Sequence, residues 1–297
     1  MDKIATLVKA TRPQFLIITP VCLSVGISLV IKDGGTFNFG FLTLAFIGAL
    51  FAHIAVNVLN DYFDYQSGLD LHTVPTPFSG GSGILVNKIM KPKSSLIYGS
   101  TTLVIATIIG VYLAFKVSLL IFLVGIPGIL LIALYTQYIT RSPFLCLIAP
   151  GLGFGPLFIV GIYIVLTGGI SASSISASII PGLLVSNLLL VNQFPDVEAD
   201  ERFKRKVLPV VFGRKTGAHV FTVLLILTYL SGLVAVLIDV LPVTALLFFL
   251  TLPLAVFVAI GVLRNYDNVE DIIPYLGMNV LLTISAPLLL TVGIMID

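Results

Sequence analysis

Long apolar stretches recur along this chain of 297 residues at lengths that suit membrane-spanning helices. A helix needs roughly 20 apolar residues to cross a bilayer, and continuous apolar runs favour helices over barrel strands, in which apolar and polar residues alternate. Nine stretches without Asp, Glu, Lys or Arg cover residues 14–31, 41–59, 95–115, 117–138, 144–167, 178–194, 218–238, 240–263 and 272–296. The pattern predicts an all-α integral membrane protein, with one domain over residues 1–297 formed by a single bundle of nine transmembrane helices.

Composition agrees with this prediction and excludes other classes. With 58% hydrophobic and 10% charged residues, the chain is too apolar for a soluble globular protein, in which roughly 25% charged is usual. The net charge of +2 offers no basic field to hold nucleic acid. Cys22 and Cys146 lie far apart within apolar stretches, so neither a disulfide nor a thiolate metal site is expected. Nothing in the sequence indicates an obligatory protein partner.

The basic residues predict the orientation in a cell membrane, because short cytoplasmic loops retain Lys and Arg. If the N-terminus is cytoplasmic, all but two of the 16 Lys and Arg residues fall on the cytoplasmic side of the nine stretches. The two exceptions are Lys32 and Lys116. We therefore expect a cytoplasmic N-terminus, an external C-terminus, and chemistry confined to the cytoplasmic loops.

Two clusters of acidic residues lie at the expected cytoplasmic ends of helices. The first follows the second apolar stretch and contains Asn57, Asn60, Asp61, Asp64 and Asp70. The second follows the sixth stretch and contains Asn192, Asp196, Glu198, Asp200 and Glu201. In each cluster an Asn and two Asp recur at intervals of three or four residues, which places them on one face of a helix.

Like charges at this spacing repel, so a compensating cation is expected. Mg²⁺ suits such a site because it takes oxygen ligands and is commonly held by one or two carboxylates together with substrate phosphates. Solvated loop carboxylates are the alternative for either cluster alone. The matching position of the clusters favours one joint site, in which bridging metals hold a diphosphate. Their separation by four helices also suggests two related four-helix halves and a ninth helix.

At these residues the sequence resembles the UbiA-type intramembrane prenyltransferases. Their paired motifs read here Asn60-Asp61-Tyr62-Phe63-Asp64 and Asp196-Val197-Glu198-Ala199-Asp200. The menaquinone-pathway branch, which includes 1,4-dihydroxy-2-naphthoate polyprenyltransferases, is similar also in residues 60–70, Arg12-Pro13, Leu134-Tyr135-Thr136, the glycine-rich residues 151–161 and residues 208–214. The resemblance covers nearly the whole chain.

This resemblance implies a cytoplasm-facing cavity in which a polyprenyl group passes from its diphosphate to an acceptor within the membrane. It implies Mg²⁺ as cofactor and the ligands Asn60, Asp61, Asp64, Asp196 and Asp200. The expected acceptor is a dihydroxynaphthoate, with a hydroxybenzoate, a haem or a glycerol-phosphate lipid as alternatives. The sequence departs from the branch at Pro195, where an Arg is common, and at residues 204–208, which read Lys-Arg-Lys-Val-Leu in place of Gly-Lys-Arg-Thr-Leu.

Further residues are candidates for the same reaction. Among the aromatic residues near the cytoplasmic ends, we select Tyr135 as the catalytic residue that shields an allylic carbocation. The candidates for binding diphosphate are Asn57, Asn60, Asn192, Arg141, Lys206 and Ser79. Ser79 belongs to the Gly/Ser-rich residues 76–83, which are either a lid over the diphosphate or a plain linker. A cation transporter with paired acidic sites is the alternative from another class of protein, although no Asp or Glu lies centrally in a predicted helix.

Overall fold

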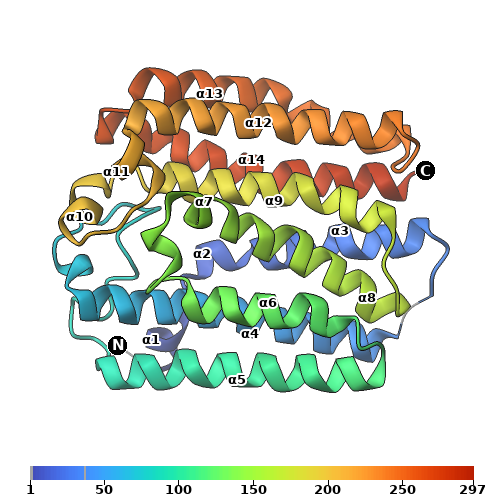
Figure 1. Ribbon diagram of the computed structural model, residues 1–297, viewed down its shortest axis with the longest axis horizontal. Coiled ribbons are helices and arrows are strands. Elements are labelled where there is room, and N and C mark those ends of the chain that lie inside the picture. The colour runs from blue at the N-terminus through green and yellow to red at the C-terminus, as the bar shows by residue number, and fades with distance from the viewer. Residues whose placement is uncertain (1–2, 37) are drawn as a thin grey trace.

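The computed structural model describes residues 3–36 and 38–297, and within these ranges every regular element is helical. The shorter elements are α1 (Lys3–Ala10), α2 (Pro13–Leu16), η1 (Leu69–Leu71), η2 (Ile139–Arg141), α10 (Val197–Arg202) and α11 (Leu208–Phe212). The longer ones are α3 (Ile18–Lys32), α4 (Phe39–Ser67), α5 (Pro92–Lys116), α6 (Ile121–Leu134), α7 (Pro143–Leu152), the π-helix η3 (Gly153–Val160), α8 (Gly161–Thr167), α9 (Ala172–Asn192), α12 (Arg214–Leu237), the 3₁₀-helix η4 (Val243–Thr251), α13 (Leu252–Asn265) and α14 (Val269–Met295). The long helices run side by side (Figure 1).

The structure confirms an all-helical membrane architecture. In the described ranges, eight helical segments are long and apolar enough to cross a membrane. The fourth expected helix is shorter than the sequence predicts, because α6 has 14 residues and residues 135–138 form turns. The count of nine transmembrane helices is therefore not confirmed, although each predicted apolar stretch corresponds to a helical segment.

Helix α4 continues beyond its apolar stretch and carries the first acidic cluster on its last turns. The side chain of Asn38 caps its start by accepting hydrogen bonds from the backbone N–H groups of Gly40 and Phe41. The helix ends at Gly68, whose φ of 86° is the left-handed conformation that glycine adopts without a Cβ clash. Asp61 and Asp64 are therefore held on a rigid helix.

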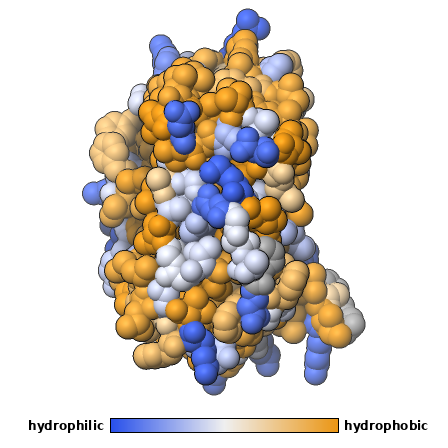
Figure 2. Space-filling view, turned by 90° about the vertical axis from the view of Figure 1, so that its right-hand side faces the viewer, coloured by the Kyte–Doolittle hydropathy of each residue, from blue (hydrophilic) through white to orange (hydrophobic). Residues whose placement is uncertain are grey.

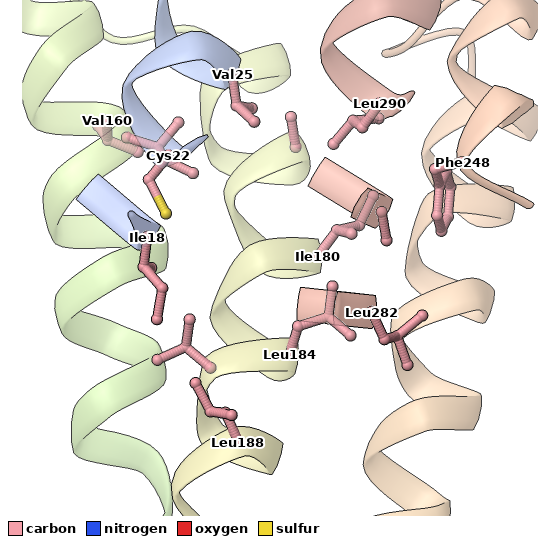
Figure 3. Packing of buried hydrophobic residues seen from close by; sticks show 14 of the residues in the cluster. Ile18, Cys22, Val25, Val160, Ile180, Leu184, Leu188, Phe248, Leu282 and Leu290 are labelled. Carbon is pink, nitrogen blue, oxygen red and sulfur yellow. The ribbon is translucent and has the colours of Figure 1, made fainter. Parts of the chain in front are cut away.

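Helix α9 is the centre of the bundle. In its most apolar window 72% of residues are buried, the highest share among the candidate membrane helices described. Figure 3 shows Ile180, Leu184 and Leu188 of α9 between side chains of α3 and α14, where they pack in the main hydrophobic core. Even its polar residues Ser178 and Asn187 are buried, as expected of a helix that other helices enclose on all faces.

The second acidic cluster does not lie on one continuous helix, which corrects the expectation from spacing. Helix α9 ends at Asn192, and α10 begins at Val197. Pro195 lies between them, and proline lacks the N–H that a continuing helix requires. Asp196 and Asp200 are thus presented by a turn and a short helix, in contrast to the first cluster.

The two ends of the bundle carry different elements. Helices α10 and α11 lie at one end, and the C-terminus lies at the other (Figure 1). Figure 2 looks onto the C-terminal end, where hydrophobic residues predominate and hydrophilic ones lie near the centre and along the top and bottom edges. Near the α3–α4 connection, Asp33 accepts hydrogen bonds from Tyr163 Oη at 2.6 Å and Ser173 Oγ at 3.1 Å, which ties this connection to α8 and α9.

Candidate functional site

The two buried carboxylates on α4 are each paired with an arginine from a distant part of the chain. Asp61 forms an ion pair with Arg12, which directly precedes α2, and Asp64 forms one with Arg205, which follows α10. Both aspartates are buried, at 4% and 5% exposed. Because an unpaired buried charge is strongly unfavourable, these arginines are integral to the folded site.

The asparagines of the first cluster connect α4 to neighbouring segments. Asn57 Nδ2 donates to the carbonyl of Thr11 at 2.9 Å, and Asn60 Nδ2 donates to Thr136 Oγ1 at 3.1 Å. Arg12 Nη2 lies 3.4 Å from Asn60 Oδ1. These contacts hold the end of α4 against the residue before Arg12 and against the turn that follows α6.

Arg205 links the second cluster to the first. Its Nη1 lies 3.5 Å from Oδ1 of Asp200, while its Nη2 contacts Asp64. The segment between α9 and α10 is held by Arg214, whose guanidinium donates twice to the carbonyl of Phe194, at 3.0 and 2.9 Å. The guanidinium of Arg205 therefore lies between carboxylates that are far apart in the sequence, so the two clusters converge.

The Gly/Ser-rich residues 76–83 contact both clusters. The backbone N–H of Ser82 donates to Asp61 Oδ2 at 3.1 Å, and Ser79 Oγ donates to Asp196 Oδ1 at 3.2 Å. A plain linker would not be expected to reach both groups. This arrangement favours the lid over the linker.

A cavity of about 540 Å³ opens between the clusters and continues into the bundle. Most of the site residues predicted from the sequence line it: Asn57, Asn60, Asp64, Ser79, Tyr135, Asn192, Asp196 and Asp200. Asp61 is buried in its pair with Arg12, which does line the cavity. Arg141 and Lys206 are exposed and are not among the described residues that line it, so the structure does not bring these two predicted residues to the site.

The carboxylates of the site outnumber its arginines, and the pKa values of three of these carboxylates are raised. Burial, together with the charge of Asp200, raises the pKa of Asp196 to about 7. Burial raises the pKa of Asp200 to about 6, despite the opposing effect of Arg205. Burial and the charges of the first cluster raise the pKa of Asp70 to about 7. The site therefore carries more potential negative charge than two guanidiniums neutralise, and additional cations would favour the ionised carboxylates.

Comparison with known proteins identifies the family of this chain. The model of the UbiA prenyltransferase family matches residues 20–282, which is most of the sequence. The chain belongs to the UbiA prenyltransferase family. It is thus an integral membrane protein of a family of enzymes, and the resemblance noted from its motifs is confirmed.

Several curated UbiA relatives are similar to the chain. A 1,4-dihydroxy-2-naphthoate octaprenyltransferase of Bacillus subtilis is 33% identical over 178 residues, which cover 59% of this chain and 55% of that protein. The match thus spans little more than half the length of that relative. UbiA prenyltransferase domain-containing protein 1 of Gallus gallus is 27% identical over 77% of this chain and 68% of its own length. A 2-carboxy-1,4-naphthoquinone phytyltransferase of Synechocystis is 23% identical over 89% of this chain and 84% of its own length.

Solved structures share the fold. A UbiA homologue from Archaeoglobus fulgidus bound to DMAPP and Mg²⁺ superposes with a TM-score of 0.67 at 16% identity, covering 97% of this chain and 99% of that one. A structure of digeranylgeranylglyceryl phosphate synthase gives a TM-score of 0.62 at 15% identity and full coverage of both chains. At these identities the likeness establishes the UbiA fold.

The two acidic clusters are chemically suited to the Mg²⁺ that is bound in the Archaeoglobus structure. Oδ1 of Asn192 is buried and accepts no hydrogen bond among the described residues, and the buried Oδ1 of Asp200 has only its 3.5 Å ion-pair contact with Arg205. Carboxylate and amide oxygens are ligands that Mg²⁺ accepts, and the excess of carboxylates favours a divalent cation. No group of three His, Cys, Asp or Glu side chains that could hold a metal ion occurs in residues 3–36 and 38–297.

Two arginines in the centre of this UbiA site were not selected from the sequence. Arg12 was noted only as part of the Arg12-Pro13 resemblance, and Arg205 is one of three consecutive basic residues. Positive residues at the cytoplasmic ends of helices are expected from topology alone, so position along the chain could not distinguish Arg205 from Arg141. The signal in the sequence that could have distinguished Arg205 is its position five residues after Asp200.

Proposed function

We propose that the protein transfers a polyprenyl group from a prenyl diphosphate to an aromatic acceptor, with a dihydroxynaphthoate-type acid as the acceptor. The observation that carries this proposal is the form of the cavity, which combines converging carboxylates and arginines at one end with an apolar interior. The charged end suits a diphosphate, and the apolar interior suits a prenyl tail. The names of the Bacillus and Synechocystis relatives support a naphthalene-derived acceptor.

In this proposal the diphosphate binds between the two clusters. The guanidiniums of Arg12 and Arg205 donate hydrogen bonds to its oxygens, since arginine binds phosphate in a planar, two-pronged geometry. Asn60, Asp61, Asp64, Asp196 and Asp200 hold Mg²⁺, which when bound supplies positive charge that stabilises the departing diphosphate. Ser79 and the backbone N–H groups of residues 79–83 close over the diphosphate.

The bond between C1 of the prenyl group and the diphosphate oxygen breaks, and its electron pair leaves with the diphosphate. The ring of Tyr135, which lines the cavity, stabilises the resulting allylic cation. An electron-rich carbon of the acceptor then forms a bond to C1 and afterwards loses a proton, or carbon dioxide where it carries a carboxylate. The apolar wall excludes water, which would otherwise capture the cation.

We also propose that the site and the N-terminus face the cytoplasm and that the C-terminus lies outside. Figure 1 places α10 and α11 and the C-terminus at opposite ends, as this orientation requires. Substrate and product are lipid-soluble, so the protein acts within the membrane. Labelling of single introduced cysteines at residues 204 and 297 with an impermeant reagent distinguishes the two sides.

The test of function is prenyl transfer by the purified protein in lipid nanodiscs. Labelled prenyl diphosphates are combined with a dihydroxynaphthoate, a hydroxybenzoate, a haem or a glycerol-phosphate lipid, and mass spectrometry identifies the products. Formation of prenylated naphthoate supports the proposal. A product from another acceptor alone would reject the naphthoate, and cation flux through proteoliposomes without any prenylated product would reject prenyl transfer.

Substitutions in the clusters test the mechanism. Asp64→Asn and Asp196→Asn are each expected to lower kcat by roughly a hundredfold or more, the effect of removing one group that stabilises a charged transition state. Glu201→Gln is the matched control, because Glu201 is exposed and lies on the same short helix as Asp200. Full activity in both aspartate variants, with the proteins correctly inserted, would exclude these carboxylates from catalysis.

A further inference from the structure

A buried polar pair lies in the wall of the cavity, apart from the two acidic clusters. Six residues of α4 that precede Asn57 line the cavity: Ala45, Gly48, Ala49, Ala52, His53 and Val56. Of these six, only His53 has a polar side chain. Thr19 of α3 also lines the cavity, and its Oγ1 lies 2.8 Å from Nδ1 of His53. Thr19 and His53 are 1% and 6% exposed, and neither has a part in the reaction described above.

The contact between Thr19 and His53 determines which ring nitrogen carries the proton. In a neutral imidazole one nitrogen donates a hydrogen bond and the other accepts one. Nδ1 of His53 is the hydrogen-bond partner of the Thr19 hydroxyl, which has no other among the described residues. A buried hydroxyl that donates to nothing is unfavourable, so we assign Thr19 as the donor and Nδ1 as the acceptor. The ring proton is then on Nε2.

The Nε2–H group of His53 is open to the cavity. Nε2 has no hydrogen-bond partner among the described residues, and it is not one of the unpaired side-chain atoms that those residues fully enclose. Because Nδ1 is turned towards Thr19, Nε2 is the polar atom of this ring that a bound molecule can reach. The ring of Phe154 packs edge-on against the imidazole, with centroids 4.6 Å apart and planes at 69°, and this fixes the direction of Nε2.

His53 lies two helical turns deeper than the end of α4 that carries the first acidic cluster. His53, Asn57 and Asn60 are spaced at i, i+4 and i+7, so they share one face of α4, and all three line the cavity. At a rise of about 1.5 Å per residue, His53 is roughly 10 Å from Asn60 along the helix. Reacting atoms approach to about 3–3.5 Å, and a hydrogen bond to Nε2 spans about 2.9 Å. The distance that remains has the size of an aromatic ring.

An N–H group in an apolar wall is favourable only when an oxygen pairs with it. The neighbouring lining residues Ala49, Ala52 and Val56 have no polar side-chain atom to offer. A prenyl tail is a hydrocarbon and has no hydrogen-bond acceptor, whereas the ring of the proposed aromatic substrate carries oxygens. The chemistry of this position therefore matches the aromatic substrate rather than the tail.

We propose that Nε2 of His53 donates a hydrogen bond to a ring oxygen of the aromatic acceptor, at the edge of the ring that points away from the diphosphate. Thr19 is the positioning residue that keeps the proton on Nε2. This inference rests on the proposed prenyl transfer and adds the residue that determines acceptor specificity. His53 then favours a dihydroxynaphthoate over the monohydroxynaphthoate that lacks the second hydroxyl.

The experiment compares kcat/KM for these two naphthoates with one prenyl diphosphate. Because the second hydroxyl also changes the reactivity of the ring, the informative quantity is the change in the preference between wild type and variant. His53→Phe keeps a ring but removes the N–H, and it is expected to lower the preference for the dihydroxynaphthoate about tenfold. His53→Gln retains an N–H donor and is expected to keep part of the preference. His219→Gln is the control, since His219 is exposed and its Nδ1 bonds to the carbonyl of Lys215.

The outcomes separate a role in specificity from a role in packing. An equal loss of kcat/KM with both naphthoates in His53→Phe would mean that His53 only packs, and would overturn the inference. A preference in His53→Gln no higher than in His53→Phe would also overturn it, since the N–H would not be the selecting group. If His53→Phe does not insert, Thr19→Val is measured instead, and an unchanged preference in that variant would count against the inference.

A second measurement does not depend on turnover. Calorimetric titration of the protein in nanodiscs with each naphthoate, without a prenyl donor, is expected to show tighter binding of the dihydroxynaphthoate by the wild type and a smaller difference in His53→Phe. If this difference is found but no prenylated product forms, the proposed function fails while the naphthoate-binding role of His53 stands. A prenylated product with an unchanged preference in the variants would reject the role of His53 alone.

Discussion

Glycine has opposite roles on the two sides of this bundle. On the side formed by α12, η4, α13 and α14, a Cβ at Gly293 would lie 2.2 Å from the carbonyl oxygen of Thr244, and one at Gly232 would lie 2.6 Å from the ring of Phe248. On α6, a Cβ at Gly125 or Gly128 would meet nothing within 4 Å, although the neighbouring α4 and α5 pack closely at Gly99, where a Cβ would lie 2.8 Å from the side chain of Leu59. The first side is held together by close contact between helices, as small residues permit in membranes. The second borders the cavity along α6, and ion pairs hold the charged end of that cavity.

The largest effect on stability is expected at the charged end of the cavity, where ion pairs rather than close packing hold the segments together. Arg205→Ala would leave Asp64 and Asp200 buried without their shared guanidinium, and breaking such a pair typically costs about 3 kcal/mol or more. Thermal unfolding of the variant in detergent measures this loss. Lys206→Ala is the control, because Lys206 is exposed and only its backbone N–H bonds to Thr140. Equal stability of the two variants would show that packing, and not Arg205, holds the charged end of the cavity together.

A smaller loss is expected on the packed side. Gly293→Ala places a methyl group against the backbone at Thr244 and Ala245, neither of which can rotate away. Helices α14 and η4 must therefore separate, and overpacking of this kind costs roughly 1–3 kcal/mol. The midpoint of detergent unfolding is expected to fall in Gly293→Ala, while prenyl transfer by the protein that remains folded is preserved. An unchanged midpoint would contradict the close approach of these helices.

The sequence predicted the spans and the two acidic clusters, because both depend on local patterns. Apolar length gives a membrane helix, and a cluster at a helix end is visible without knowledge of the fold. The extension of α4 to Ser67 follows from the spacing of its polar residues. The break after α9 could have been read from Pro195, but the similar spacing of the two clusters argued for a second continuous helix.

What the sequence could not supply depends on tertiary contacts. Arg12 and Arg205 reach the aspartates only because distant segments meet at the end of the bundle. Gly125 and Gly293 are both glycines in apolar helices, and nothing adjacent to them in the chain indicates that one borders a cavity and the other a neighbouring backbone. The shape of the cavity is therefore a property of the assembled helices.

The smallest predicted effect is a gain in stability, and it sharpens the contrast between the two sides of the bundle. Gly128→Ala adds a methyl group where no atom lies within 4 Å, so it introduces no overlap. Alanine favours a helix over glycine by up to about 1 kcal/mol, and the variant is expected to unfold at the same or a slightly higher temperature in detergent. A methyl group leaves most of the cavity open, so prenyl transfer is expected to continue. A loss of stability comparable to that of Gly293→Ala would mean that Gly128 lies against a neighbouring helix and does not border the cavity.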